Sequence, residues 1–226
     1  MPANPSAGPP GVSVVIPNYN GAALLERNLP PLISALREAG ADYEIIVSDD
    51  ASADGSVAFI KAGYPDIIVL TSPANSGFST NINRGIARAS KPLTFLMNTD
   101  IRLEPGYFAP LLPYFSEPGV FGVMGRIVGM ADDKIQDSAK YPRRNGLQID
   151  GTPNYLPASG TRAPPLFLSG AEALVDTEKL KRLNGFDEIF SPFYGEDLDL
   201  GLRAWRSGWT CWYEHSAVCR HKTSST

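Results

Sequence analysis

The chain has 226 residues, of which 43% are hydrophobic and 19% charged, so it is long enough to bury one substantial core and is not of the disordered class. Its formal charge of −4 argues against a general nucleic-acid-binding protein, whose surface is normally basic. No apolar run approaches the ~20 residues that span a bilayer, and two cysteines are too few for a disulfide framework, so a reducing cytoplasm is the simplest location.

Residues 1–11 differ in composition from the rest of the chain. They are rich in Pro, Ala and Gly and lack the basic start and apolar stretch of a secretory signal. We expect them to form a disordered lead-in, and we expect residues 12–226 to form a single domain.

Apolar strands and helical patterns alternate through the first half. Short β-branched or apolar runs predict four strands, at Val12–Ile16, Tyr43–Val47, Ile67–Leu70 and Leu93–Met97. Helical spacing predicts three helices between them, at Leu24–Leu36, Asp54–Ala62 and Ser79–Ala89. Pro30 and Pro31 should kink or divide the first helix. This alternation predicts an α/β fold with a mostly parallel central sheet flanked by helices.

The second half is less regular. The segment Ala131–Pro165 has little periodicity, and a loop of this length is usually functional or disordered. Beyond it the patterns predict a strand at Leu166–Leu168, helices at Thr177–Leu183 and Glu196–Ser207, and short strands at Trp209–Tyr213 and Ala217–Val218.

Three polar segments directly follow predicted strands: Pro17–Asn20, Ser48–Ala51 and Asn98–Asp100. Ligands of parallel α/β sheets bind beyond the carboxyl ends of the strands, so these segments predict a ligand site. Asp100 could bind a hard divalent cation there, although an Asp in this position is more often a turn former. Of Asp49 and Asp50, one could face the site while the other caps the next helix, or both could simply form the turn and cap.

The densest acidic cluster is Glu196, Asp197 and Asp199. Carboxylates are favoured in the first turn of a helix, but this group could also supply a general base. Neighbouring carboxylates would raise one another's pKa. The set Cys211, His215, Cys219 and His221 does not have the spacing of a structural zinc site. Asn75–Phe78 opens a helix with a glycine, which favours phosphate, but no dinucleotide or P-loop fingerprint is present.

A series of segments, in order and spacing, resembles the family-2 nucleotide-sugar glycosyltransferases, which have the GT-A fold, a Rossmann-like α/β architecture. The segments are Val14–Asn20, Val47–Ser52 with Asp54–Ser56, Asn75–Phe78 with Asn83 and Gly85, Leu96–Asp100, Ser169–Ala171, Gly185–Glu188, and Phe193–Leu200 with Arg203 and Gly208. The C-terminal part looks most like bacterial enzymes of the rhamnosyltransferase type. The resemblance implies that residues 12–226 form one catalytic domain, and the chain could be a fragment because relatives often continue further.

The resemblance also implies roles for individual residues. Pro17, Asn18 and Tyr19 would line the base pocket, and Asp50 would hydrogen-bond the base; the other substrate-binding positions would be Asn75, Gly77, Asn83, Asn98 and Thr99. Asp100 matches the last position of the family's Asp-x-Asp metal motif, whose first position is Asn98 here, which offers an oxygen but no charge. His221 looks like the late histidine that completes the metal site, and His215 is the weaker candidate. Asp197 matches the catalytic base, with Glu196 as its neighbour, although the two roles could be reversed.

The implied activity is inverting transfer of a sugar from a nucleotide-diphosphate donor to a hydroxyl of a glycan or lipid-linked glycan, as in polysaccharide biosynthesis. A diphosphate leaving group needs its charge neutralised and the chain is acidic, so Mn²⁺ or Mg²⁺ is expected, and imidazole ligation favours Mn²⁺. No nucleic-acid partner is expected. The location would be the cytoplasm, including the inner face of the membrane, with peripheral membrane association through segments missing from this chain.

Two other classes remain open from the sequence. A non-catalytic sugar-nucleotide or glycan-binding module of the same fold would account for Asn98 and the short C-terminus. A nucleotidyltransferase shares acidic metal ligands at strand ends, but it would want a basic Gly-rich loop after the first strand, where this chain has Asn18–Ala22.

Overall fold

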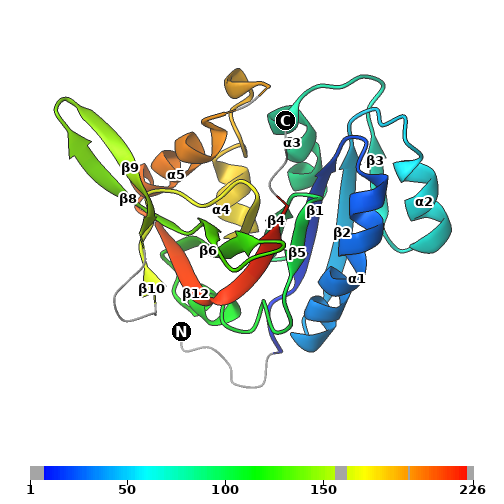
Figure 1. Cartoon of the computed structure of the whole chain (residues 1–226), viewed down its shortest axis with the longest axis horizontal. Helices are drawn as coiled ribbons and strands as arrows, with labels where there is room; N and C mark the ends of the chain where they lie inside the picture. The colour runs from blue at the N-terminus through cyan, green and yellow to red at the C-terminus, as the bar shows by residue number, and fades with distance from the viewer. Residues whose placement is uncertain (1–7, 156–161, 193, 223–226) are drawn as a thin grey trace.

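A large sheet with helices packed against it organises the computed structural model, which describes residues 8–155, 162–192 and 194–222 (Figure 1). The sheet has ten strands, and eight of them follow the order β10-β12-β6-β11-β4-β1-β2-β3. The expected α/β fold is therefore confirmed. Most of the expected lead-in, residues 1–7, lies outside the described residues.

The first half of the chain forms the parallel part of the sheet. Its strands are β1 (Val12–Asn18), β2 (Tyr43–Asp49), β3 (Ile68–Thr71) and β4 (Leu93–Met97). β1 is central and pairs in parallel with β2 and β4, and β2 pairs with β3. The connecting helices are α1 (Ala22–Glu38), α2 (Ser56–Gly63) and α3 (Phe78–Arg88). All seven predicted elements are thus confirmed, with ends shifted by up to a few residues.

Alternation along β1 creates two hydrophobic cores, one on each face of the sheet. Val12, Val14 and Ile16 belong to the core that α1 and α2 cover. Val15, between them, belongs to the opposite core, which α3, α4 (Thr177–Arg182) and α5 (Glu196–Arg206) cover. Because successive side chains of a strand point to opposite faces, a strand buried on both faces reads as a continuous apolar run.

The two prolines do not divide α1, contrary to one of the sequence-based alternatives. The helix runs unbroken from Ala22 to Glu38 with Pro30 and Pro31 inside it. Its buried stripe includes Leu25, Leu29, Leu32 and Leu36, each at most 1% exposed. Burial of these leucines offsets the two backbone hydrogen bonds that the prolines cannot donate.

The second half of the sheet is mixed, not parallel. β5 (Ile101–Leu103), a 3-10 turn η1 (Leu112–Ser116), β6 (Val120–Gly129) and β7 (Ile135–Asp137) follow β4. β11 (Glu172–Asp176) lies antiparallel between β4 and β6. The strand expected at Leu166–Leu168 is wrong, since those residues form none. The strand β11 was not predicted, because the acidic residue Glu172 at its start interrupts the apolar run.

One long strand replaces the two short ones expected at the C-terminal end. β12 (Thr210–His221) pairs in parallel with β6, and the register shifts between Tyr213 and Val218. This irregularity explains why the pattern looked like two strands. The helices α4 and α5 and the 3-10 turn η2 (Glu188–Phe190) precede it.

The segment Ala131–Pro165 is not a single irregular loop. It contains β7, the hairpin of β8 (Ala139–Asn145) and β9 (Gln148–Tyr155), and the short β10 (Arg162–Ala163). The hairpin forms its own two-stranded sheet and projects beyond the main sheet (Figure 1). A projecting hairpin has little buried surface on either face, so the sequence shows no period-2 burial pattern. Residues 156–161 lie outside the described residues.

Within the described ranges, no helix is both long enough and apolar enough to cross a membrane.

Candidate active site

A cleft lies at the carboxyl ends of β1, β2 and β4. Its volume is about 320 Å³, which is within the range of small-molecule sites. The structure brings together here most of the residues that the sequence singled out: Pro17, Asn18, Tyr19, Asp50, Asn75, Gly77, Asn98, Thr99 and Asp100. Phe78, Asn81 and Pro192, which the sequence did not suggest, also line it. The cleft is where the rule for parallel sheets places a ligand.

Asp50 anchors the loop that forms one wall of the cleft. Its carboxylate accepts hydrogen bonds from the Ser76 amide (2.8 Å), the Ser76 hydroxyl (2.8 Å) and the Gly77 amide (3.0 Å). The Arg84 guanidinium lies 3.6 Å from the same carboxylate. Gly77 has φ +85°, and a Cβ at this position would lie 2.7 Å from the Ser191 hydroxyl. The loop therefore has a defined conformation that needs both the carboxylate and the glycine.

Hydrogen bonds also hold the β1 side of the cleft. The Asn18 amide donates to Asp49 (2.7 Å) and to the Ser52 hydroxyl (3.1 Å). Asn28 on α1 donates to the Thr99 carbonyl at 2.7 Å and so fixes the turn after β4. The turn is further held by the Asn98 amide, which donates to the Ala171 carbonyl at 2.9 Å.

Asn83, predicted to bind substrate, lies outside this cleft. Its side-chain amide donates to the Phe186 carbonyl (2.8 Å), and its oxygen accepts from the Phe186 amide (2.9 Å). Asn83 thus ties α3 to the segment before η2. This pair of hydrogen bonds gives Asn83 a structural role, because it joins two elements that are far apart in the sequence.

Asp100 and His221, predicted as metal ligands, are brought together from positions 121 residues apart. The distance from His221 Nε2 to Asp100 Oδ2 is 3.1 Å. The hydrogen bond with Asp100 raises the pKa of His221, against the effect of burial, and the charges of Asp100 and Asp137 raise it further. Asp100 Oδ1 is buried and has no hydrogen-bond partner within the described part of the chain.

Gln136 on β7 sets the tautomer of His221. Its Nε2 faces the His221 carbonyl at 3.4 Å, and its Oε1 lies 2.7 Å from His221 Nδ1. A carbonyl can only accept, so the amide nitrogen must face it and Oε1 must accept from Nδ1–H. Neutral His221 therefore turns the lone pair of Nε2 toward a carboxylate oxygen. Two acceptors in that position require either a proton shared between them or a cation bound by both groups.

The donor set is suited to a divalent cation. It offers a carboxylate with an unpartnered oxygen and an imidazole whose tautomer is fixed by a neighbour, which is common for histidines that bind metals. Among the described residues, no group of three or more His, Cys, Asp or Glu side chains is gathered in metal-binding geometry. The protein side chains of this kind would thus be the pair Asp100 and His221.

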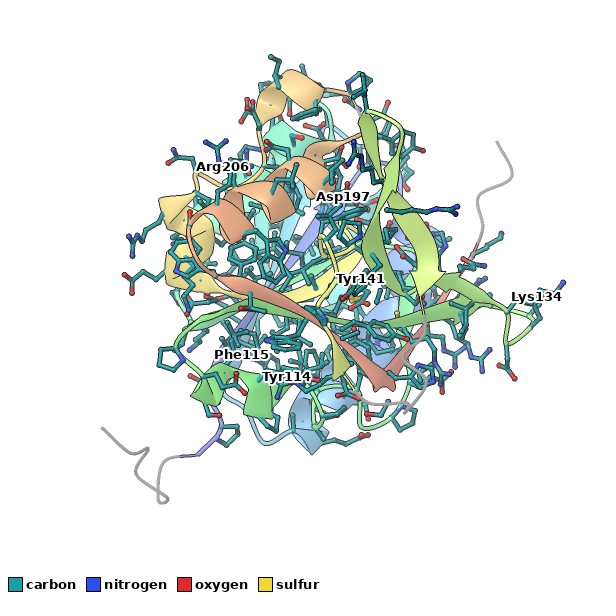
Figure 2. The ribbon with its side chains drawn as sticks, turned by 90° about the vertical axis from the view of Figure 1, so that its left-hand side faces the viewer. Tyr114, Phe115, Lys134, Tyr141, Asp197 and Arg206 are labelled. Atoms are coloured by element: carbon teal, nitrogen blue, oxygen red, sulfur yellow. The ribbon has the colours of Figure 1, made fainter. Side chains whose placement is uncertain are left out.

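Asp197 and Glu196 lie at the start of α5, beside the segment Ser169–Ala171. Asp197 Cβ would lie 3.5 Å from a Cβ on Gly170, and it lines a small cavity with Ser169 and Gly170. Because the Asn98 amide bonds the Ala171 carbonyl, this segment connects the acidic pair to the turn that carries Asp100. Figure 2 shows Asp197 close to the base of the β8–β9 hairpin, on the side where Tyr141 lies.

The two neighbouring carboxyls are held in different ways. Burial raises the pKa of Asp197, although the Leu198 amide, the charge of Lys140 and the Gly170 amide partly oppose it. Burial also raises the pKa of Glu196, and the charge of Asp197 adds to this. Glu196 is 7% exposed and its Oε2 has no hydrogen-bond partner in the described ranges, whereas Asp197 is more accessible. Asp197 is thus the better placed of the two to meet a ligand.

His215 belongs to a different environment. The Arg126 guanidinium lies 3.0 Å from its Nε2, and the Tyr213 hydroxyl lies 2.9 Å from its Nδ1. Burial and the charge of Arg126 lower its pKa. Cys211 and Cys219 are buried and free of disulfide bonds. These contacts favour structural roles for all three residues.

Gln136 and Lys140 are the functional candidates that sequence reasoning missed. Lys140 is ion-paired with Asp137 and influences the pKa of Asp197. Both residues lie in the segment that looked like one long loop. Its length indicated function, but no periodicity pointed to particular side chains.

Comparisons with known proteins show the family and the fold. A family model described as glycosyl transferase family 2 matches residues 13–174. A protein of Mycobacterium tuberculosis (strain CDC 1551 / Oshkosh), named N-acetylglucosaminyl-diphospho-decaprenol L-rhamnosyltransferase, is 29% identical over 94% of this chain and 76% of its own length.

Two solved structures share the fold. GalNAc-T7 with UDP, GalNAc and Mn²⁺ has a TM-score of 0.79 at 17% identity, covering 96% of this chain and 44% of that one. The mannosyltransferase PcManGT of Pyrobaculum calidifontis, in complex with GDP-Man and Mn²⁺, has a TM-score of 0.71 at 18% identity, covering 98% of this chain and 59% of that one. The chain therefore spans less than two thirds of both solved proteins.

Proposed function

The chain belongs to glycosyl transferase family 2 and is a glycosyltransferase, and from that premise we propose inverting, metal-dependent transfer from a nucleoside-diphosphate sugar to an acceptor hydroxyl. The observation that carries the proposal is the meeting of Asp100 with His221 at the edge of the cleft. Neither the nucleotidyltransferase nor the binding-module alternative has a comparable observation in its favour.

In this proposal the nucleoside diphosphate occupies the cleft. Pro17 and the half-exposed Tyr19 provide apolar surface for the base, and Asp50 stands at the inner wall. Because the Asp50 carboxylate already accepts three hydrogen bonds from Ser76 and Gly77, its main contribution is to hold the Asn75–Gly77 wall in shape. A base that reaches Asp50 would share that carboxylate with the loop.

The diphosphate would lie toward Asp100 and His221. These residues would hold Mn²⁺ or Mg²⁺, and the mixture of oxygen and imidazole favours Mn²⁺. When bound, the cation would neutralise charge that builds up on the departing diphosphate. Gln136 keeps the Nε2 lone pair of His221 turned to this position. Among the described residues that line the cleft there is no lysine or arginine.

Asp197 would act as the general base. It accepts the proton of the acceptor hydroxyl as that oxygen bonds to the anomeric carbon and the bond to the diphosphate oxygen breaks. One displacement from the face opposite the leaving group inverts the anomeric configuration. The raised pKa of Asp197 suits the role, because a more basic carboxylate takes up a proton more readily.

For the acceptor we propose a glycan or lipid-linked glycan, used at the cytoplasmic face of a membrane. The relative from M. tuberculosis is named for transfer to a lipid-linked diphosphate sugar, and it matches across most of this chain.

Substitution of the proposed metal ligand tests the proposal. Asp100→Ala should abolish the enhancement by Mn²⁺ of nucleoside-diphosphate binding, because one of two protein ligands and the negative charge of the site are lost. Titration calorimetry with uridine, guanosine and thymidine diphosphates, each with and without Mn²⁺, measures it. The exposed Asp66 gives a matched control, since Asp66→Ala makes the same change away from the cleft. If Asp100→Ala binds Mn²⁺ and the diphosphate like wild type, Asp100 is only a turn residue.

A further inference from the structure

The side of the molecule that carries the β8–β9 hairpin has an apolar groove. The groove has a volume of about 280 Å³, and its walls include Tyr141, Pro142, Pro165, Leu166, Leu202 and Trp205. Several of these side chains are open to solvent: Tyr141 is 43% exposed, Leu202 43% and Trp205 37%. The Trp205 indole N–H donates to the Pro165 carbonyl at 3.3 Å, so the polar end of the ring is satisfied while apolar surface stays exposed.

An apolar side chain also stands at the tip of the hairpin. Leu147, in the turn between β8 and β9, is 99% exposed. The hairpin projects beyond the body of the protein (Figure 1), and the exposure of Leu147 means that its side chain packs against no core. Exposed leucines are common, but this one lies at the tip of the same hairpin whose Tyr141 and Pro142 line the apolar groove.

Exposed basic residues surround this surface. The three segments that build it, residues 141–147, 162–170 and 201–208, contain five arginines and no Asp or Glu, although the whole chain has 24 acidic residues and a formal charge of −4. Two of the five, Arg162 and Arg203, are ion-paired with Glu117 and Asp199 outside these segments, and Asp150 on β9 lies opposite Arg143 in the strand register. Arg143, Arg144 and Arg206 are exposed. Figure 2 looks onto this side and shows Arg206, Tyr141 and Asp197 on it. An acidic protein that concentrates arginine and exposed apolar groups on one side is complementary to an anionic, apolar partner.

We propose that the β8–β9 hairpin and the exposed side of α5 dock on an anionic lipid bilayer, with Leu147 inserted among the acyl chains and the arginines at the head groups. Tyr and Trp favour the interfacial layer of a bilayer, and arginines beside it are attracted by its negative surface potential. A polyprenyl chain lying in the groove would leave Leu147 exposed at the tip, whereas a bilayer buries both. This surface needs no segment beyond the described residues.

Docking in this orientation would serve the transfer reaction. α5 carries Asp197 at its first turn and Leu202 and Trp205 near its other end. A bilayer against the groove would therefore contact the same helix whose first turn carries the proposed base. This consequence rests on the proposed function, but the docking itself does not.

Sedimentation with vesicles tests the docking without donor, metal or turnover. The full chain should bind vesicles of mixed phosphatidylglycerol and phosphatidylcholine and should not bind phosphatidylcholine alone. Leu147→Asp should weaken binding by roughly tenfold or more, the scale of one leucine side chain withdrawn from an apolar medium. Arg143→Glu with Arg144→Glu should weaken it by at least about fivefold for each charge.

Two further variants make the result specific. Arg27→Glu with Arg102→Glu reverses two exposed charges outside the three segments and should leave vesicle binding unchanged. Leu147→Trp should retain binding, and its fluorescence should shift to the blue when phosphatidylglycerol vesicles are added. Unchanged nucleoside-diphosphate binding by every variant would show that the fold and the cleft are intact.

Three outcomes would overturn the proposal. The wild-type chain could fail to bind phosphatidylglycerol vesicles, or the hairpin variants could bind them like wild type. The third is a concentration-dependent dimer in light scattering that Leu147→Asp abolishes, which would assign the surface to a second copy. Asp197→Asn should bind vesicles normally, so a failure of docking and a failure of the proposed chemistry can be told apart.

Discussion

The carboxylates on the loops around the donor cleft differ from those on the acceptor side, Asp197 and Glu196, in how many hydrogen bonds they accept and in how burial affects their pKa. Asp49, Asp50 and Asp54 each accept two or more hydrogen bonds from neighbouring backbone or side-chain groups. Burial is the largest single influence on the pKa of Asp54 and raises it, but hydrogen bonds from Ser56 and the Ala22 amide together lower that pKa below its usual value. On the other side, burial raises the pKa of Asp197 and Glu196.

The difference separates carboxylates that build the site from carboxylates that can react in it. A carboxylate with satisfied oxygens fixes loops and has little left to give a ligand. A carboxylate can still bind a proton or a cation if it is partly desolvated. The same holds if one of its oxygens has no hydrogen-bond partner, as in Asp100. The five predictions below test this division and the groups around it, beginning with the largest expected effect on transfer.

The sharpest test is Asp197→Asn, which should lower single-turnover transfer by about 10²–10⁴ while donor affinity stays near wild type. The amide keeps the shape of the carboxylate but cannot take up the proton. Glu196→Gln is the matched control and should be milder, because Glu196 is the more buried neighbour. Near-normal transfer by Asp197→Asn would remove Asp197 from the mechanism, and an inactive Glu196→Gln beside it would give the role to Glu196.

The pH dependence of wild-type transfer follows from the same carboxyl. A base must be deprotonated, and the pKa of Asp197 is raised, so activity should fall on acidification at a higher pH than an ordinary aspartate would give. The acidic limb should disappear from the residual activity of Asp197→Asn.

Gln136→Leu should weaken Mn²⁺ binding by about 10–100-fold, the usual effect of removing a group that orients a metal-binding histidine. Gln136→Glu is the control, because its carboxylate can still accept from His221 Nδ1–H. Electron paramagnetic resonance titration of Mn²⁺ measures affinity, and nitrogen NMR of His221 reports the tautomer. A leucine variant with unchanged affinity and an unchanged Nδ1–H tautomer would show that Gln136 does not orient the ring.

Asp50→Ala should weaken nucleoside-diphosphate binding by about 1–3 kcal/mol, because the Asn75–Gly77 wall loses its anchor along with any contact to the base. Ser76→Ala removes the hydroxyl partner alone and should cost less, about 0.5–1.5 kcal/mol. Calorimetry on both variants separates the two contributions. Full affinity in Ser76→Ala with weak binding in Asp50→Ala would assign Asp50 to the base and not to the loop.

The last prediction concerns the pH dependence of stability. Burial raises the pKa of Glu172 to about 8, and it bonds the Tyr107 hydroxyl and the Gly125 amide. The folded protein therefore holds a proton that the unfolded chain releases, so this group's contribution to stability is complete below about pH 4.5 and is lost as pH rises toward about 8.

Glu172→Gln, which cannot ionise, should gain stability relative to wild type by up to about 1.4 kcal/mol per pH unit across that window. Urea denaturation at a series of pH values measures the difference. A constant difference between the two proteins would mean that Glu172 titrates normally.

Much of the donor half, which consists of β1–β4 with α1–α3, could be predicted from the sequence because its apolar residues recur with the simple periods of strands and helices. The β1 strand is apolar on both faces, and the polar residues after it fall at a strand end where the sheet rule places a ligand. The strands of the second half of the chain, the acceptor half, were predicted less well because their apolar residues do not follow those periods. β11 begins with the buried carboxyl group of Glu172, β12 carries a register shift, and β8 and β9 project from the main sheet.

The same contrast applies to the site. Asp100, Asp197 and His221 could be named because a motif marks them, but no motif or period marks Gln136. Its importance comes from a contact across 85 residues of chain, and only the fold reveals that. Asn83 shows a different contrast, since a motif position suggested a ligand contact and the structure adds a tie between two elements, which only the fold reveals.

The place of β11 in the sheet has a consequence for how the protein folds. In the described ranges before residue 172, no strand pairing joins β1–β4 to β6 and β7; β11 makes both connections, to β4 through Leu96 and to β6 through Val123. During synthesis the donor half can form early from contacts close in sequence, whereas the other half must wait for a strand made much later. We therefore expect a nascent chain that stops before β11 to carry two unjoined edges and to depend on chaperones. The formation of β11 would join the two parts of the sheet. It would also bring Asp197, the proposed general base, beside the donor site.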